Sequence, residues 1–450
     1  MEQVAAPRRM FSGTDLRRLI VPLVIEQVLA VTVGMADVIM VSSVGEAAVS
    51  GVSLVDMVNV LIINVFAALA TGGAVVSAQL IGAKERERAC HSAKQLLLIV
   101  SVISAVVMAL CLLFRTPLLR LLFGQIDPDV MRNARVYFLL SALSYPFLAV
   151  YNASAALFRA QGNSRISMQV SIVINVLNIG GNALFIYGMA MGAAGAALSS
   201  LMSRALGAVI MTALLRRPGN LVSIGRGGSF RPDGVMIGRI LNIGIPNGLE
   251  NSMFQLGKIL VVGIIAAFGT TQIAANAVAN NFDALGCLPG QALSLAIITV
   301  VGQCVGAQDY EQARYYAKKL MKLAYLIMAA LNIVILASLP LTLRAYNLSP
   351  DTMKLAMILI FIHDGSAILL WPAAFTLPNV LRAANDVRFA MAVSIFSMWV
   401  FRCVFGFILG SWLGWGAIGV WVAMIMDWIF RASLFVWRYL SGRWTRHKIA

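Results

Sequence analysis

Residues 79–94 read QLIGAKERERACHSAK, and residues 303–318 read QCVGAQDYEQARYYAK. Seven of the sixteen aligned positions are identical, with no gap, and the residue numbers of the two copies differ by 224 (303 − 79). In both copies a glycine lies between a long apolar stretch and a charged one, as expected where a helix ends and the chain meets water. The same short segment therefore occurs twice, half the chain apart, which indicates two copies of one structural unit.

The composition shows what kind of unit this is. The chain has 450 residues, 60% of them hydrophobic and only 12% charged, and its mean hydropathy is +0.84. A soluble protein carries about 25% charged residues, so most of this chain does not face water. Apolar stretches such as 96–114 and 323–341 approach the ~20 residues that a helix needs to cross a bilayer. Because the alternation of a membrane β-barrel is absent, the sequence predicts an all-α polytopic membrane protein.

Twelve transmembrane helices are predicted. We place them near residues 15–42, 47–80, 90–115, 129–156, 164–188, 191–215, 236–267, 272–306, 312–342, 351–378, 387–410 and 414–438. The short loops on one side contain no Lys or Arg, whereas the opposite side holds about 25 of the 35 basic residues, which makes that side and both termini cytoplasmic. The net charge of +16 then reflects topology and contact with anionic lipid headgroups of the plasma (cytoplasmic) membrane. We expect no nucleic-acid binding, because no soluble basic domain is present.

The repeat extends well beyond the opening segment. Further matched pairs at the same offset are Pro22 with Pro246, Glu26 with Glu250, and Gly45 with Gly269. Each half contains an even number of spans, so both halves insert the same way up. This is the parallel-repeat plan of some secondary transporters.

The predicted organisation is two parallel six-helix repeats. Residues 1–215 form the N-terminal lobe, 216–235 a basic cytoplasmic linker, and 236–450 the C-terminal lobe with a basic tail. The chain contains no GxxxxGK[ST] phosphate loop, so nucleotide-driven transport is not expected. Ion coupling would instead need ionisable or polar groups inside the spans, where charge is costly and usually functional.

Histidine and cysteine give little sign of a metal centre. The three histidines (His91, His363 and His447) are few and scattered along the chain. The five cysteines include no CxxC pair and are interpreted as packing residues within the spans. We expect no organic cofactor.

Several segments, taken together and in this order, resemble the multidrug and toxic compound extrusion (MATE) transporters. They are the doubled segment quoted above, MADVIMVSSVG (35–45), FRAQGNS (158–164), NIGGNALFIYGMAMGAAGAAL (178–198), GIPNGLE (244–250) and LRAANDVRF (381–389). The resemblance covers essentially the whole chain. It implies export of amphiphilic, often cationic small molecules in exchange for H⁺ or Na⁺, by two lobes in a V shape that alternate access to the two sides. We expect a monomer surrounded by membrane lipids.

The resemblance also implies a coupling site in the first half. The acid of the family's first helix falls on Asp37, and an Asn followed four residues later by an Asp falls on Asn178 and Asn182. The second position is Asn here, which weakens any scheme with two carboxylates. Asn175, Asn178 and Asn182 share one helix face. This stripe either bridges helices by hydrogen bonds or completes a site for Na⁺ or H⁺ around Asp37; no other metal is expected.

The second half departs further from the family pattern. The positions where relatives carry acids hold Phe254 or Gln255, and Trp371. The repeat aligns Asp56 with Asn280 and Asn59 with Asp283, so each half presents one acid and one amide. Substrate-cleft candidates are Asp56, Asn59, Glu250, Phe254, Gln255, Asn280, Asp283, Asp364 and Trp371. Structural pairing of these groups remains the alternative.

Two other functions compete with a drug or cation antiporter. A flippase of the same superfamily, moving a lipid-linked saccharide, would be favoured by a strongly cationic cavity, whereas the candidate cleft groups are mostly acidic. An intramembrane enzyme is a distant alternative, since the sequence contains no HExxH motif, no DDxxD-like pair and no plausible Ser/His dyad. The sequence therefore favours the antiporter over an enzyme.

Overall fold

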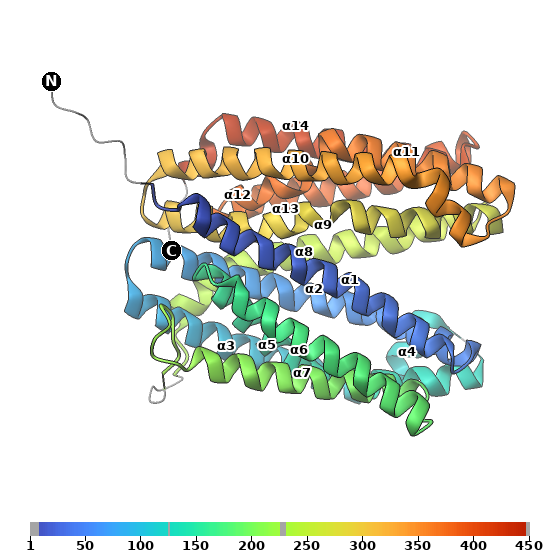
Figure 1. The fold of residues 1–450 in the computed structure, drawn as a ribbon, viewed down its shortest axis with the longest axis horizontal. Helices are drawn as coiled ribbons and strands as arrows, with labels where there is room; N and C mark the ends of the chain where they lie inside the picture. Colours follow the sequence, from blue (N-terminus) through green and yellow to red (C-terminus); the bar gives the residue numbers. More distant parts are fainter. Residues whose placement is uncertain (1–8, 125–126, 226–230, 447–450) are drawn as a thin grey trace. The chain divides into compact units, whose positions relative to one another are not determined.

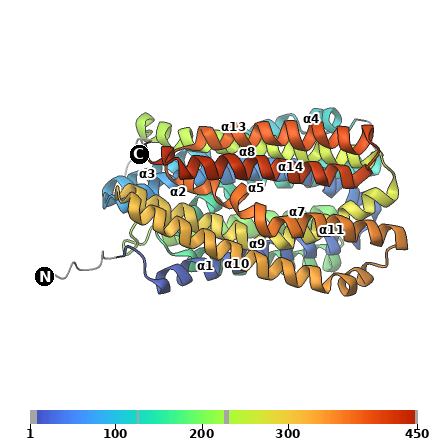
Figure 2. The same cartoon turned by 90° about the horizontal axis from the view of Figure 1, so that it is seen from above.

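The computed structural model describes residues 9–124, 127–225 and 231–446. Over these residues the chain is helical and contains no strand (Figure 1; Figure 2). Twelve helical spans in this part of the chain are long and apolar enough to cross a membrane. The predicted all-α fold with twelve spans is confirmed. The boundaries agree closely, and the tenth span shows one of the larger differences, since it was expected to end at residue 378 and ends at Ala383.

The first half of the chain contains seven α-helices and one π-helical turn. They are α1 (Gly13–Ser42), α2 (Glu46–Gly82), α3 (Arg86–Leu113), α4 (Arg115–Phe123), α5 (Pro128–Ala160), α6 (Ser164–Asn182), η1 (Ala183–Gly188) and α7 (Ala193–Leu215). The short helix α4 was not predicted. Within this half α2 packs on α5, and α5 packs on α3 and α7.

The second half repeats this order with more interruptions. Its elements are α8 (Gly234–Ala266), α9 (Thr270–Gly306), α10 (Tyr310–Thr342), η2 (Leu343–Tyr346), α11 (Pro350–Trp371), η3 (Pro372–Thr376), α12 (Pro378–Ala383), α13 (Val387–Ser397), η4 (Met398–Phe405), η5 (Ile408–Trp412), α14 (Gly416–Leu440) and η6 (Arg443–Arg446). Pro372 opens the π-helical turn η3, where a missing backbone N–H interrupts the regular helix. Here α9 packs on α10 and α11, and α11 packs on α14.

The doubled segment forms the same helix ending in both halves. Helices α2 and α9 each have 37 residues. Just past them Lys84 and Gln308 adopt left-handed backbone angles, with φ of 63° and 58°. The amide of Glu85 donates to the carbonyl of Leu80 at 2.9 Å, and the equivalent bond in the second half measures 3.0 Å. This closes the last turn in the manner of a Schellman motif, so the sequence repeat is also a repeat of backbone geometry.

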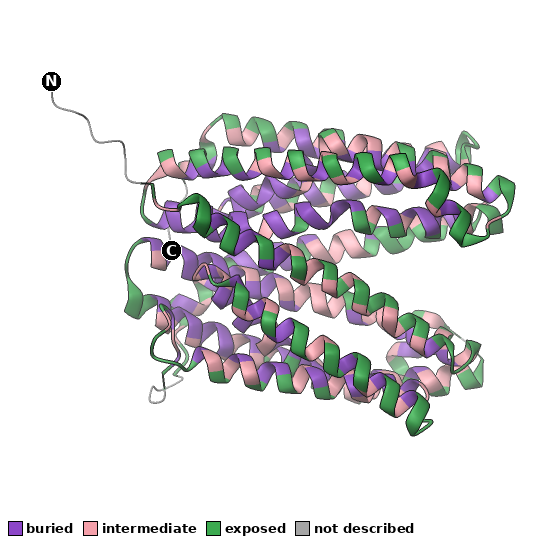
Figure 3. Ribbon diagram, viewed as in Figure 1, coloured by how far each residue is buried: buried purple, intermediate pink, exposed green. Residues whose placement is uncertain are grey.

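Helix α10 shows how each span divides its surface. Apart from the adjacent pair Tyr316 and Ala317, its buried residues recur every three or four positions; they are Ala313, Tyr316, Ala317, Leu320, Ala324, Met328, Asn332, Ile335 and Leu339. Its exposed face is also apolar, with Ile333 and Val334 56% and 62% exposed. Figure 3 shows buried and exposed residues alternating along this helix. An apolar exposed face is what lipid tails require of a spanning helix.

The chain packs as two compact units. One runs from Arg17 to Gly248, and the other runs from Leu249 onward and includes the segment that precedes Arg17. That segment joins the second unit through backbone amides, because Met10 donates to the Gln312 side chain at 2.7 Å and Phe11 donates to the Tyr316 hydroxyl at 2.8 Å.

The described parts of the predicted linker are held by helix α3. The guanidinium of Arg86 donates to the carbonyls of Pro218, Asn220 and Leu221 at 2.9–3.3 Å. The side chain of Gln95 bonds the backbone on the far side of residues 226–230, which are outside the described residues. Both ends of the connection therefore lie against the same helix.

Candidate functional site

The first candidate site, in the N-terminal unit, centres on Asp37. This residue lies on α1, and the side-chain amide of Asn182 on α6 donates to its Oδ1 at 2.5 Å. Asp37 is half-buried and Asn182 is 1% exposed. The structure therefore brings together two of the residues selected from the sequence, 145 positions apart.

The asparagine stripe on α6 leaves acceptor atoms without partners. Asn178 donates to the Ser200 hydroxyl at 3.2 Å and Asn175 donates to the Ser171 hydroxyl at 3.3 Å. The buried Oδ1 atoms of Asn178 and Asn182 have no hydrogen-bond partner among the described residues. Buried oxygens without donors are costly, and a cation bound between Asp37 and α6 would relieve that cost for those it reaches. Flipping the Asn182 amide, so that its nitrogen and oxygen exchange places, would direct the oxygen to such a cation.

Asp56 and Asn59, also in the N-terminal unit, belong to a different hydrogen-bond network. Asn59 donates to Oδ1 of Asp56 at 3.0 Å and accepts from the Tyr145 hydroxyl at 2.8 Å, while the Tyr137 hydroxyl donates to Asp56 at 3.2 Å. Asn59 is buried, and its network links α2 to α5. These contacts favour the structural pairing of the two residues over a free substrate contact.

The second candidate site is a cavity of about 550 Å³ within the C-terminal unit. Five of the predicted cleft residues line it, namely Glu250, Phe254, Asn280, Asp283 and Trp371. Gln255 and Asp364 are not among its lining residues. Its aromatic wall consists of Trp371 stacked on Phe375 with ring centroids 5.1 Å apart, and Phe254 meeting Phe375 edge-on at 6.0 Å.

The charges of this cavity differ from expectation. The prediction of mostly acidic cleft groups is wrong here, because Lys258, Arg382, Arg402 and Arg431 line the cavity with only two carboxylates, Glu250 and Asp283. Of these four residues only Arg382 lies in a loop assigned to the cytoplasmic side. Lys258, Arg402 and Arg431 lie within predicted spans but were not considered as cleft residues. The cavity is nevertheless not strongly cationic, since Arg382 pairs with Glu250, and both Arg431 and, at 4.0 Å, Arg402 pair with Asp427.

One of these pairs is repeated in both units. Arg382 donates to Glu250 at 2.7 Å, and the equivalent Arg159 donates to Glu26 at 3.2 Å. Each pair joins the middle of the first spanning helix of a half to the end of the fourth. A pair present in both copies of the internal repeat is a structural feature of the unit, so Glu250 holds helices together besides lining the cavity.

The pair of Arg431 with Asp427 lies deeper. Arg431 donates to Oδ1 of Asp427 at 2.9 Å, and the Ser397 hydroxyl donates to the same oxygen. The guanidinium of Arg431 also lies over the rings of Phe375 and Phe254, at 4.9 and 5.2 Å from their centroids. The charge of Arg431 is therefore paired with Asp427, and its guanidinium also makes cation–π contacts with the two aromatic rings.

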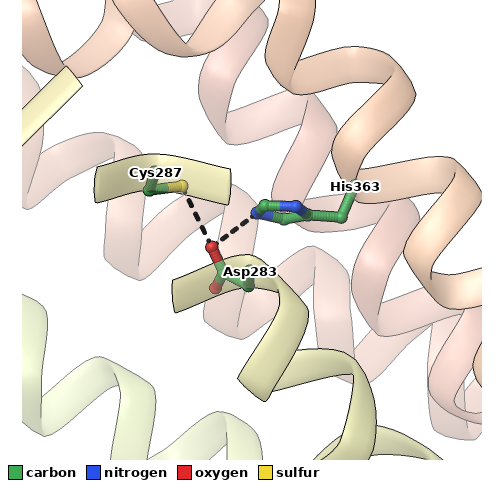
Figure 4. A group of neighbouring side chains, drawn as sticks. All are labelled: Asp283, Cys287 and His363. Atoms are coloured by element: carbon green, nitrogen blue, oxygen red, sulfur yellow. Dashed lines mark hydrogen bonds and ion pairs between the residues drawn. The ribbon is translucent and has the colours of Figure 1, made fainter. Parts of the chain in front are cut away.

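A third group of side chains connects the cavity to helix α11. His363 lies between two carboxylates, with Nδ1 2.6 Å from Oδ1 of Asp364 and Nε2 2.7 Å from Oδ1 of Asp283. The thiol of Cys287 lies 3.2 Å from the same oxygen of Asp283. Figure 4 shows Asp283 and Cys287 one turn apart on α9, with the imidazole reaching them from α11.

His363 was the functional candidate that sequence reasoning missed. It is 1% exposed and packs edge-on against Trp428 and Trp421, with ring centroids 4.9 and 5.7 Å away. The only sequence signal was its direct neighbour Asp364, a second ionisable residue in the same span. The long separation of Asp283 and His363 along the chain conceals their contact.

A protein-family model matches the chain twice, once in each half of the internal repeat. A model of the MatE family matches residues 22–184 and 246–408. The starts of the two matches differ by 224 in residue number, and so do their ends (246 − 22 and 408 − 184). This confirms the repeat offset read from the sequence.

Two relatives are similar over nearly their whole length. The uncharacterized transporter YisQ of Bacillus subtilis is 26% identical over 438 residues, covering 95% of this chain and 94% of the relative. The probable multidrug resistance protein NorM of Thermotoga maritima is 27% identical over 445 residues, covering 97% and 94%.

Solved structures share the fold. A crystal structure of MATE in complex with MaL6 superposes with a TM-score of 0.90 at 21% identity and covers 96% of both chains. The outward-facing structure of a multidrug resistance MATE family transporter of the MOP superfamily superposes with a TM-score of 0.89 at 20% identity, and again 96% of both chains is covered. The twelve-helix architecture is therefore the one these transporters use.

Proposed function

The chain belongs to the MatE family of membrane transporters, and from this premise we propose that it is a secondary active exporter of amphiphilic, cationic drugs or other toxic organic compounds. Export is coupled to antiport of H⁺ or Na⁺ and proceeds by alternating access. The proposal involves no enzymatic step and no organic cofactor. The names of the relatives support a transporter, and that of the NorM relative supports multidrug resistance.

The observation that carries the coupling proposal is the contact between Asp37 and Asn182. A carboxylate inside a membrane span is expensive and usually functional. This one contacts Asn182, whose buried amide oxygen has no partner, and Asn178, one turn earlier on the same helix, has a second such oxygen. Oxygen ligands of this kind suit Na⁺, and the carboxylate alone suits a proton. Either ion can drive the cycle if its affinity differs between the two access states.

The working unit we propose is a monomer in the plasma membrane with both termini cytoplasmic. Divided by the internal repeat, residues 1–215 and 236–450 form the two lobes, and residues 216–235 connect them on the cytoplasmic side. By packing, residues 9–16 belong to the second unit and residues 236–248 to the first. The basic composition of that connection and the anchoring of its described ends by Arg86 support this assignment.

The test is transport of a fluorescent cationic dye by purified protein in lipid vesicles. Imposed H⁺ and Na⁺ gradients, applied separately, should drive dye movement, and collapsing them should stop it. Asp37→Asn keeps the volume and removes the charge, so gradient-driven transport should be lost while the protein still inserts. Asp129→Asn, which alters an exposed carboxylate at the start of α5, is the matched control and should transport normally.

Asn182→Asp is the sharper probe, because a second acid should change the ion preference or the pH dependence without abolishing the site. Dye movement that persists without either gradient would disprove secondary transport. An Asp37→Asn variant with normal rate and normal ion dependence would place the coupling site elsewhere.

A further inference from the structure

The group formed by Asp283, Cys287 and His363 is not explained by the proposed coupling site, which lies in the other unit. We propose that these three side chains form a binding site for a transition-metal ion of the Zn²⁺ class in the wall of the C-terminal cavity. One potential ligand atom from each residue lies within 4.8 Å of the others. The inference is independent of the proposed exporter function.

The histidine supplies the first argument. If Nδ1 donates its proton to Asp364, 2.6 Å away, the neutral ring leaves a bare lone pair on Nε2. That lone pair would face a carboxylate oxygen of Asp283 at 2.7 Å. Two lone pairs at this distance repel each other. In this tautomer a positive charge shared by the two atoms is needed, and it is either a second proton or a metal ion.

Cys287 favours the metal ion over the proton. Its sulfur is 3.2 Å from the same carboxylate oxygen, and the three different donor atoms lie within 4.8 Å of one another. Thiolate, imidazole and carboxylate together are ligands of Zn²⁺ and related soft ions, whereas Na⁺ and Mg²⁺ prefer oxygen alone. Three protein ligands also leave one position of a tetrahedral ion open.

Two of the three donor distances are close to those of a tetrahedral ion. Tetrahedral Zn²⁺ with bonds of about 2.0–2.3 Å sets its donor atoms about 3.3–3.6 Å apart. The sulfur-to-oxygen distance is 3.2 Å, and Nε2 of His363 has to withdraw from Oδ1 of Asp283 by roughly half an ångström. The Asp364 carboxylate behind the ring provides the usual outer partner of a metal-binding histidine.

Charge and access agree with this assignment. A divalent ion with one thiolate and one carboxylate is neutral overall. Of the other charges nearby, Lys258 and Asp364 have opposite signs, and Arg402 lies 4.0 Å from Asp427. Asp283 and Cys287 line the cavity whereas His363 does not. The open coordination position would thus face the cavity, where water or a solute can reach it.

The test uses the full chain, purified in detergent and stripped with a chelator, titrated with Co²⁺ as a spectroscopic substitute for Zn²⁺. We expect one ion per chain, with the visible bands of tetrahedral Co²⁺ and a near-ultraviolet sulfur-to-cobalt charge-transfer band. Added Zn²⁺ should displace the Co²⁺ and so remove both sets of bands. If the unsubstituted protein shows no stoichiometric site in this titration, the proposal is overturned.

Three substitutions make the assignment specific. Cys287→Ser should remove the charge-transfer band, and Asp364→Asn should weaken binding by about 10–100-fold through the histidine. Cys304→Ser is the matched control, because this buried cysteine lies on the same helix, α9, about 25 Å further along it. A band that survives Cys287→Ser, or disappears in Cys304→Ser, would show that the ion binds elsewhere.

Discussion

Breaking the buried pair between Arg382 and Glu250 should destabilise the C-terminal unit strongly. The side chains are only 10% and 8% exposed, and their charged atoms lie 2.7 Å apart. Arg382 also donates to Asn379 at 2.8 Å. Replacing Arg382 by Met keeps most of the side-chain volume but leaves the carboxylate of Glu250 buried without its partner.

The magnitude follows from this geometry. Two unit charges 2.7 Å apart attract each other by about 6 kcal/mol at an effective dielectric constant of about 20. Desolvation of both groups offsets part of this, and removing one partner of a buried pair typically costs about 3–5 kcal/mol. In a domain of about 200 residues, 1 kcal/mol shifts the melting midpoint by about 2–4 °C. Arg382→Met should therefore lower the midpoint by about 6–20 °C.

The assay is thermal unfolding of the detergent-solubilised protein, followed by tryptophan fluorescence. The double variant Glu250→Leu with Arg382→Met should recover much of the loss, since it leaves no unpaired buried charge. Arg159→Met is the internal control: its pair with Glu26 is longer, at 3.2 Å, and its side chains are 16% and 12% exposed, so the loss should be smaller. Equal losses from the two single variants, or a double variant no better than Arg382→Met, would refute the reasoning.

Three further outcomes are expected. The first uses a chain whose native cysteines are replaced by serine and which carries a new cysteine at Ser229, a position outside the described residues. This cysteine should react with an impermeant thiol reagent only from the cytoplasmic side. Labelling from outside would invert the topology. Gly290→Ala should cost about 1–3 kcal/mol in thermal unfolding, because the added Cβ would collide with the ring of Trp371; an unchanged midpoint would mean that the ring moves freely. Asp309→Ala should cost about 1 kcal/mol by removing a helix cap, whereas Glu85→Ala at the equivalent position, which makes no capping bond, should cost less; equal effects would contradict the assignment.

The twelve spans could be predicted from the sequence because the bilayer demands a local property. Each spanning helix must satisfy its own backbone and present an apolar surface, so hydropathy over about 20 residues reveals it. The repeat was equally accessible, since the glycine and charges that end α2 and α9 recur at a fixed offset. The short helix α4 lacked such a signal and was missed.

The sites depended on contacts between distant segments. Asp37 and Asn182 were grouped in advance only through the family resemblance, and the structure joins them across 145 positions. Glu250 was interpreted as a cleft acid, and its arginine partner, 132 residues away, could not be identified by spacing.

The sequence by itself determined the membrane class, the spans and the duplication, because these follow from hydropathy and local helix-ending residues. Only the tertiary structure decided the polarity of the C-terminal cavity and the gathering of Asp283, Cys287 and His363. A histidine and an aspartate on two different spans form no pattern that can be read along the chain. Packing of α11 on α9 brings the imidazole to 2.7 Å from the carboxylate. Pair distances of this kind are set by how helices pack, and a single sequence does not encode them in any local pattern.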